Sequence, residues 1–148
     1  MRCLALMCLL VAGQAFALDR LDEQAVKALV DRQALMIMHK DIDPLMALYD
    51  PAFHQIIPAE KNRVLDRDGV RKIWNANFAI AKMILSTVDL RQVTVREDGQ
   101  HAVARAHYRN RYLIQLKDSQ KLIEQEDDFI TEIALRNGEA VFVSMEKL

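Results

Sequence analysis

The sequence predicts an α+β fold in which three N-terminal helices cover a curved, mixed or antiparallel sheet. Two observations predict it. Residues 21 to 83 hold three segments with apolar residues at helical spacing, and residues 84 to 145 alternate between apolar and polar residues as strands do. Asp98-Gly99 and Asn137-Gly138 interrupt the second region with dipeptides typical of tight hairpin turns. A chain of 148 residues fits one domain.

Residues 1 to 17 have the composition of a secretory signal peptide. One basic residue, Arg2, precedes an apolar run of about ten residues, and Ala15-Phe16-Ala17 supplies the small residues of a cleavage site. The run is too short for a membrane span, which needs about 20 residues. The alternative to a signal peptide is a short buried helix. We expect cleavage after Ala17, which leaves residues 18 to 148 as a periplasmic or secreted domain without membrane contact.

The cysteines, the net charge and the histidines limit which bonds, partners and metal sites the chain can have. Cys3 and Cys8 both lie in the predicted leader, so residues 18 to 148 can form neither a disulfide nor a thiolate metal site. The net charge of −1 gives no indication of a nucleic-acid partner. We expect no metal and no cofactor, because the sequence has no Gly-rich phosphate loop or nucleophile elbow and its histidines are not at metal-ligand spacing: His39, His54, His101 and His107.

Three helices are predicted between residues 21 and 83. The first spans Leu21 to Lys40 with Asp22 as its N-cap, and the second spans Asp43 to Tyr49 with Asp43 as its cap. The third spans about Asp68 to Met83, and its apolar stripe contains Val70, Ile73, Trp74, Asn77, Phe78 and Ala81. Two short strands, Phe53 to Ile57 and Arg63 to Leu65, separate the second helix from the third.

The centre of the predicted sheet is a long hairpin. Its strands run from Gln100 to Leu116 and from Lys121 to Arg136, and residues 117 to 120 close the turn. This register matches opposite charges across one face, which is therefore the outer one, in the pairs Arg105–Glu132, Arg109–Asp128 and Arg111–Glu126. A strand with a bulge near Arg91-Gln92 precedes the hairpin, over residues 84 to 96, and residues 139 to 145 form the last strand.

The inner face of this hairpin mixes polar and aromatic side chains. The same register sets Tyr108 opposite Phe129, Asn110 opposite Asp127, and Tyr112 opposite Gln125. Polar groups in such surroundings are costly to bury without a partner. The composition therefore suits a ligand pocket, and it also suits a hydrogen-bonded structural network.

Two motifs resemble those of the NTF2-like superfamily, in particular of its SnoaL-like members. The first is KDIDPLMALYDPAFHQIIP, residues 40 to 58, and the second is DGVRKIW, residues 68 to 74. In the family, a segment such as GDLDALMALYAPDAVFVPP precedes a Gly-x-x-x-Ile helix and then long antiparallel strands. The resemblance covers nearly all of the mature chain in element order. It implies a cone, in which a strongly bent sheet is wrapped by helices around a pocket.

The resemblance also implies candidate site residues. Some family enzymes use a carboxylate inside the cone as a general base, with Tyr or Asp groups donating hydrogen bonds to an enolate. The candidates here are Asp127 and, second, Asp89, with Tyr108, Asn110 and Tyr112 as donors. A carboxylate among aromatic rings is desolvated, as suits a base. The alternative is a buried structural Asp127, held by Asn110 and a tyrosine hydroxyl.

Further ligand-binding residues are expected around these donors. They are Tyr49, Trp74, Phe78, Gln125 and Phe129. Trp74 and Phe78 lie four residues apart on the third predicted helix, so they also fit an ordinary core stripe. Tyr49 also fits a structural role at the rim of the pocket.

The outer face of the sheet gives two predictions. The row of Arg105, His107, Arg109 and Arg111 could bind an anion, but the acidic strand opposite favours a solvated salt-bridge ladder. Beyond the ladder, an apolar patch is predicted from Val103, Ile130, Ala134, Val141, Val143 and Met145. Because sheet-to-sheet dimers are common in the resembled family, we expect a homodimer through this face.

Three functions remain open from the sequence. The first is binding of a small, partly apolar molecule in the cone, and the second is an isomerase, dehydratase or cyclase with Asp127 as general base. The third is a protein-interaction module, of inhibitor or immunity type, that acts through the outer sheet. A cavity would separate the first two from the third, and the reach of Asp127 to a bound carbonyl would separate the second from the first.

Overall fold

The structure, a computed structural model, describes residues 17 to 148. In chain order its elements are α1 (Glu23–His39), α2 (Ile42–Ala47), β1 (Tyr49–Ile57), the 3₁₀ helix η1 (Pro58–Glu60), β2 (Arg63–Asp66), α3 (Arg67–Ile80), β3 (Ala81–Val95), β4 (His101–Gln115), β5 (Gln120–Arg136) and β6 (Glu139–Lys147). This order confirms the predicted α+β class. The predicted signal peptide lies outside the described residues except for Ala17. No helix within residues 17 to 148 is long and apolar enough to cross a membrane.

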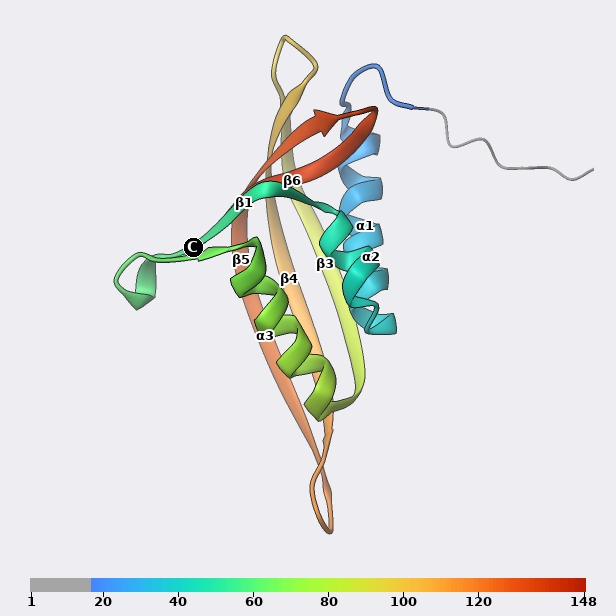
Figure 1. Cartoon of the computed structure of the whole chain (residues 1–148), viewed down its shortest axis with the longest axis vertical. Coiled ribbons are helices and arrows are strands. Elements are labelled where there is room, and N and C mark those ends of the chain that lie inside the picture. Colours follow the sequence, from blue (N-terminus) through green and yellow to red (C-terminus); the bar gives the residue numbers. More distant parts are fainter. Residues whose placement is uncertain (1–16) are drawn as a thin grey trace, which may run out of the picture.

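All six strands form one curved sheet in the order β2-β1-β6-β5-β4-β3 (Figure 1). The last four strands make an antiparallel meander, and β1 joins it by pairing in parallel with β6. The helices cover one face: α1 packs mainly on β3, and α3 packs on β1 and β3. On β4 the even-numbered residues from 102 to 112 are accordingly buried, while the odd-numbered ones are half-buried or exposed.

The core lies between the helices and the inner face of the sheet. Its fully buried side chains include Val26 and Ile37 of α1, Leu45 and Met46 of α2, and Phe142 of β6. Burying a side chain of this size contributes roughly 1.5–3 kcal/mol relative to leaving it exposed. The core therefore fixes α1 and α2 against the sheet.

The helix caps agree with the sequence for α1 and differ for α2. Asp22 Oδ1 accepts a hydrogen bond from the Ala25 amide at 2.7 Å, which confirms the predicted cap. The prediction for α2 is wrong, because Asp43 lies inside the helix and Asp41 occupies the cap position. Asp43 Oδ1 instead accepts from Arg71 Nη1 at 2.7 Å, so the carboxylate links α2 to α3.

The ends of two other predicted elements shift. Tyr49 belongs to β1 rather than to the second helix, and α3 ends at Ile80 because Ala81 already pairs with Ile114 of β4. Pro51 is tolerated within β1 because it lies in the stretch between Tyr49 and His54 where pairing with β6 is interrupted.

The register of the long hairpin differs by two residues from the prediction. Gln115 pairs with Gln120, and the loop of residues 116 to 119 is closed by a hydrogen bond from the Leu116 amide to the Ser119 carbonyl at 2.8 Å. Asp127 therefore faces Tyr108 rather than Asn110. The acidic residues of β5 repeat every two positions, so the shifted register still matches charges across the outer face: His107–Asp128, Arg109–Glu126 and Arg111–Glu124. A shift of two also preserves which side chains share a face.

The sequence predicted a bulge in β3 but not the one in β6. The register of β3 shifts between Leu90 and Gln92, which confirms the predicted bulge. An unpredicted bulge lies at Val143, because Ile133 pairs with Phe142 while Glu132 pairs with Ser144. The face of every later β6 residue is therefore reversed.

The prediction of an apolar patch on the outer face is wrong for three of its members, and the bulge explains one of them. Met145 pairs with Thr131 and is buried in the core, not on the outer face. Ala134 and Val141 are also buried, which leaves Val103, Ile130 and Val143 as half-buried members of the predicted patch.

The two-residue turn at Asn137-Gly138 is confirmed by the pairing of Arg136 with Glu139. Asn137 and Gly138 both have positive φ, 52° and 78°, as this hairpin turn requires.

Candidate functional site

A cavity of about 210 Å³ lies between α3, α1 and the inner face of the sheet. It brings together most of the predicted site residues, which reach it from β1, α3, β4 and β5: Tyr49, Trp74, Tyr108, Asn110, Tyr112, Gln125, Asp127 and Phe129. Phe78 does not line it. Its ring packs on Trp74, with ring centroids 5.6 Å apart, and is half-buried against the core.

Aromatic rings form much of the cavity wall. Tyr108 and Phe129 meet edge to face, with centroids 5.4 Å apart and an interplanar angle of 87°. They meet diagonally across β4 and β5, because Phe129 pairs directly with Ala106. Edge-to-face contacts of this kind are favourable beyond the area they bury, so the wall is well defined.

Gln33 is a lining residue that the sequence did not single out as a site residue. It lies in the apolar stripe of α1 and is 2% exposed, and its Nε2 donates to Tyr49 Oη at 2.7 Å. Burial raises the pKa of Tyr49 to about 12, and the Gln33 and Trp74 side chains beside it act in the opposite direction. This bond ties α1 to β1 across the cavity.

Several buried polar atoms at the cavity have no hydrogen-bond partner among the described residues. They include Tyr108 Oη, Asn110 Oδ1 and Gln33 Oε1. Burial raises the pKa of Tyr108, and the nearby Tyr49 raises it further. The Thr131 hydroxyl acts to lower this pKa, although the two hydroxyls do not form a hydrogen bond. A buried polar group left without a partner costs about 1–3 kcal/mol. The cavity is thus prepared for hydrogen bonds that residues 17 to 148 do not themselves supply.

Among the described residues, Asp127 of β5 is one of two carboxylates that line the cavity, with Glu60 of η1. Its side chain is 12% exposed, Oδ1 lies 2.6 Å from Lys147 Nζ, and Oδ2 accepts from Gln125 Nε2 at 2.6 Å. Burial, and second the charge of Asp127, raise the pKa of Tyr112 to about 12. Asp127 is therefore held by an ion pair and an amide, not by Asn110 and a tyrosine hydroxyl.

Lys147 was missed as a site residue because of the bulge at Val143. Strict alternation along β6 would place it on the outer face, whereas the observed pairing with Phe129 brings it to the inner face and the cavity. A run of three apolar residues, Val141 to Val143, hides the change of face in the sequence.

The second candidate carboxylate lies elsewhere. Asp89 pairs with His107 on the outer face, and its carboxylate lies 3.6 Å from Arg91 Nε. Its neighbours on that face form the predicted salt-bridge ladder, in which Arg111 Nη2 lies 3.2 Å from Glu124 Oε1 and His107 Nδ1 lies 3.1 Å from Asp128 Oδ1. Within residues 17 to 148, no group of three or more His, Cys, Asp or Glu side chains could hold a metal ion.

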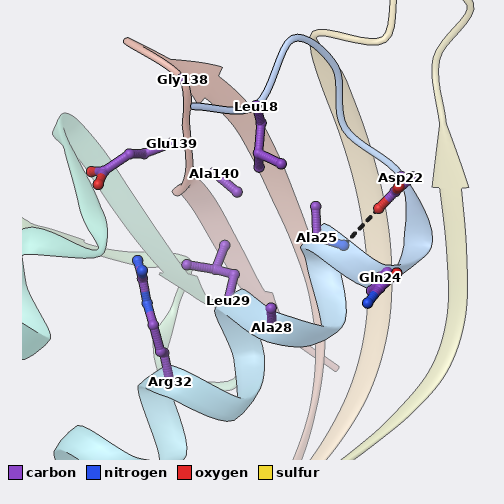
Figure 2. A pocket seen from close by; sticks show the side chains of 10 residues that line it. All are labelled: Leu18, Asp22, Gln24, Ala25, Ala28, Leu29, Arg32, Gly138, Glu139 and Ala140. Carbon is purple, nitrogen blue, oxygen red and sulfur yellow. Dashed lines mark hydrogen bonds between the residues drawn. The ribbon is translucent and has the colours of Figure 1, made fainter. Parts of the chain in front are cut away.

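A second hollow, a groove of about 440 Å³, lies between α1 and the start of β6 (Figure 2). Leu18 reaches into it, and its backbone amide donates to the Gly138 carbonyl at 2.9 Å. The Asp22 carboxylate there already caps α1, while Arg32 and Glu139 are exposed at its rim. The described lining of the groove includes small residues, Ala25, Ala28 and Ala140, and no aromatic ring, so the cone cavity is the better candidate site.

Known proteins match this chain in sequence pattern and in fold. A family model described as a SnoaL-like domain matches residues 26–121. A solved protein from Kribbella flavida superposes with a TM-score of 0.71 at 13% identity, over 85% of this chain and 88% of that one. No curated protein sequence matches significantly.

Two further solved structures carry enzyme names. A candidate scytalone dehydratase from Novosphingobium aromaticivorans has a TM-score of 0.70 at 11% identity, over 84% of this chain and 80% of that one. A candidate dehydratase of the NTF2-like family from Streptomyces avermitilis has a TM-score of 0.69 at 15% identity, over 84% and 95% of the two chains. At these identities the likeness shows the fold, and together with the family model it shows that the chain belongs to the SnoaL-like domain family and has the NTF2-like cone fold.

Proposed function

We propose that the domain binds a small, partly apolar molecule in the cone cavity. The observation that carries the proposal is the pairing of an aromatic wall with buried polar atoms that lack partners, above all Tyr108 Oη and Asn110 Oδ1. A ligand that supplies those hydrogen bonds recovers part of the cost of burying the two groups. At about 210 Å³ the cavity is smaller than the roughly 300–1,000 Å³ of sites for drug-sized ligands, so a one-ring molecule fits the proposal.

Trp74 makes this proposal measurable. It is the single tryptophan of the chain and lines the cavity, so its fluorescence reports binding directly. In a titration with one-ring probes, we expect a saturable change that Asn110→Ala weakens. Arg32→Ala, at the groove beside α1, should leave it unchanged and serves as the matched control. A titration that responds to Arg32→Ala but not to Asn110→Ala would move the site to the groove.

The second candidate function is proton transfer, as in an isomerase, dehydratase or cyclase. Asp127 favours it, because the carboxylate lines the cavity with Tyr108, Asn110 and Tyr112 close by on β4. Both carboxylate oxygens are engaged, so Lys147 or Gln125 must release one before Asp127 accepts a proton. The test is deuterium exchange at the α-carbon of a bound ketone, followed by NMR. Catalysis predicts exchange that Asp127→Asn abolishes while Trp74 fluorescence still reports binding.

We also propose a homodimer through the outer sheet face, at a position other than the predicted patch. Met83, Leu113 and Leu122, here called the distal apolar row, lie side by side on β3, β4 and β5. Met83 is 49% exposed and Leu122 is 61% exposed. Large exposed apolar side chains that are neighbours on one face of a sheet mark an interaction surface.

The charges beside this row favour a second copy as the partner. The next rows pair Arg111 with Glu124 and Arg109 with Glu126, so β4 is basic where β5 is acidic. A two-fold axis along the strands, between β4 and β5, would set each β4 over the other copy's β5. Arginines would then face glutamates, and the distal apolar row would face itself.

Secretion is part of the proposal through the predicted signal peptide. Leu18, the first residue after the predicted cleavage site, already packs on the β5–β6 turn through its bond to Gly138. Intact-mass measurement of protein recovered from the periplasm should give a chain that begins at Leu18. A chain that retains Met1 in the cytoplasm would contradict secretion.

A further inference from the structure

We infer that the ligand of the cone cavity carries an ammonium group, and that Lys147 sets this specificity by occupying the ammonium position itself in the free protein. The inference rests on the proposed binding function and adds the chemical class of the ligand. Three observations carry it: the charges of the lining residues, the position of the Lys147 ammonium group beside Asp127, and the side chains around that position.

The two carboxylates that line the cavity have different cationic partners. Glu60 is exposed and its Oε2 lies 3.0 Å from Arg63 Nη1, whereas Asp127 is paired with Lys147, the one cation among the described lining residues. When Lys147 moves away, Asp127 is left as an unpaired carboxylate beside aromatic rings, and a ligand with a positive charge restores the pairing. A carboxylate ligand would add a second unit of negative charge to a partly desolvated space, which is unfavourable.

Lys147 shows where an ammonium group sits. Its Nζ lies 2.6 Å from Asp127 Oδ1, so the two groups form a close ion pair. The Lys147 side chain is 34% exposed, against 12% for Asp127, so it reaches the carboxylate from the solvent side.

Lys147 can leave this position without disturbing the fold. It is the last residue of β6, and the backbone beyond it is fixed by a bond from the Leu148 amide to the Asp128 carbonyl at 2.9 Å. A lysine side chain is a flexible stem with a strongly hydrated head, so it can rotate into water while the strand stays in place. Lys147 is thus a displaceable, tethered competitor for any ammonium ligand.

The side chains around the position of the Lys147 ammonium group suit an organic ammonium ligand better than a bare metal or ammonium ion. Five aromatic side chains line the cavity: Tyr49, Trp74, Tyr108, Tyr112 and Phe129. Ring faces attract cations, and they also cover the apolar body of a ligand. Asn110, which is 8% exposed and lies one residue pair along the inner face from Asp127, has a buried Oδ1 without a donor. An N–H of the ligand would supply that donor.

A set of three probes with one skeleton tests the inference on the purified protein by Trp74 fluorescence. The probes are 2-phenylethylamine, which is a cation at pH 7, 2-phenylethanol, which is neutral, and phenylacetate, which is an anion. We expect the amine to bind at least about tenfold more tightly than the alcohol, and phenylacetate to bind most weakly.

The decisive variant is Lys147→Met, because it removes the competing ammonium. We expect it to increase the affinity for 2-phenylethylamine several-fold, while Asp127→Asn decreases that affinity roughly tenfold or more. Lys147→Arg keeps a competing cation and should show no gain. Lys82→Met removes the same charge from an exposed position on β3 outside the cavity lining, and it controls for the overall charge.

The outcomes separate this inference from the function beneath it. Tighter binding of phenylacetate than of the amine, with loss of that binding in Lys147→Met, would make Lys147 an anion anchor and overturn the inference alone. A decrease of amine affinity in Lys147→Met would also overturn it. If none of the three probes binds, the proposed one-ring ligand site fails, and the inference fails with it.

Discussion

Lys147 Nζ and Asp127 Oδ1 lie 2.6 Å apart at the end of the cone cavity, on two neighbouring strands of the sheet. Their contact depends on the bulge at Val143, which turns the end of β6 toward the inner face. The bulge therefore brings the cationic partner of Asp127 into the lining of the cavity.

This ion pair should appear as coupling in a double-mutant cycle. Lys147→Met leaves the Asp127 carboxylate, 12% exposed, without its cation, and Asp127→Asn leaves the lysine without its anion. The double variant should lose less than the sum of the two, by about 1 kcal/mol, because the pair is partly solvated. Chemical denaturation of the four proteins measures the coupling. Strict additivity would show that the contact contributes nothing to stability.

The same Tyr→Phe substitution should have different effects on stability at two positions. Tyr49→Phe removes the acceptor of the Gln33 side chain and leaves that buried amide without a partner, so it should cost about 1–3 kcal/mol. Tyr108→Phe removes a buried hydroxyl that has no hydrogen-bond partner among the described residues, so it should be neutral or slightly stabilising. The free energy of unfolding from urea titrations compares them. Equal losses would show that Tyr108 Oη is hydrogen-bonded in solution.

All three tyrosines of the chain should resist ionisation. Burial raises the pKa of Tyr49 and of Tyr112 from 10.0 to about 12, and it also raises the pKa of Tyr108. Because the folded state favours the neutral phenols, their contribution to stability is complete below pH 10 and is lost as the pH rises toward 12. The ultraviolet absorbance of phenolate should therefore stay flat through pH 10 and rise with unfolding. A tyrosine that titrates near pH 10 in the folded protein would contradict this burial.

The proposed dimer should depend on the distal apolar row. Leu122→Lys places a charge within that row, and we expect it to convert a dimer to a monomer in sedimentation experiments. Val64→Lys is the matched control, because Val64 is 60% exposed, as Leu122 is at 61%, but lies on β2 at the other edge of the sheet. A wild-type protein that is monomeric at all concentrations would contradict the dimer.

The sequence predicted the faces of the long hairpin but not its register. Alternation assigned Tyr108, Asn110 and Tyr112 to the inner face, where they lie in the structure. The register was wrong by two residues because acidic residues repeat every second position from Glu124 to Asp128, so two registers match charge equally well. The turn decides between them, through the bond from Leu116 to Ser119.

Site residues were predictable where alternation was unbroken and were missed where it was not. The bulge of β3 was visible because the apolar positions change parity around Arg91. The bulge of β6 was hidden by consecutive apolar residues at Val143, so Met145 and Lys147 were not assigned to the inner face. Gln33 was overlooked as a site residue because a polar side chain within the apolar stripe of α1 gives no signal of its own partner, Tyr49.

The most direct test of the cone-cavity site is a crystal structure with the tightest one-ring probe bound. We expect the probe to lie in the cone cavity, in contact with Trp74 and Tyr108, and a polar group of the probe to make a hydrogen bond with Asn110 or Tyr108. A probe that lies instead in the groove between α1 and β6, beside Leu18 and Arg32, with the cone cavity unchanged, would contradict it.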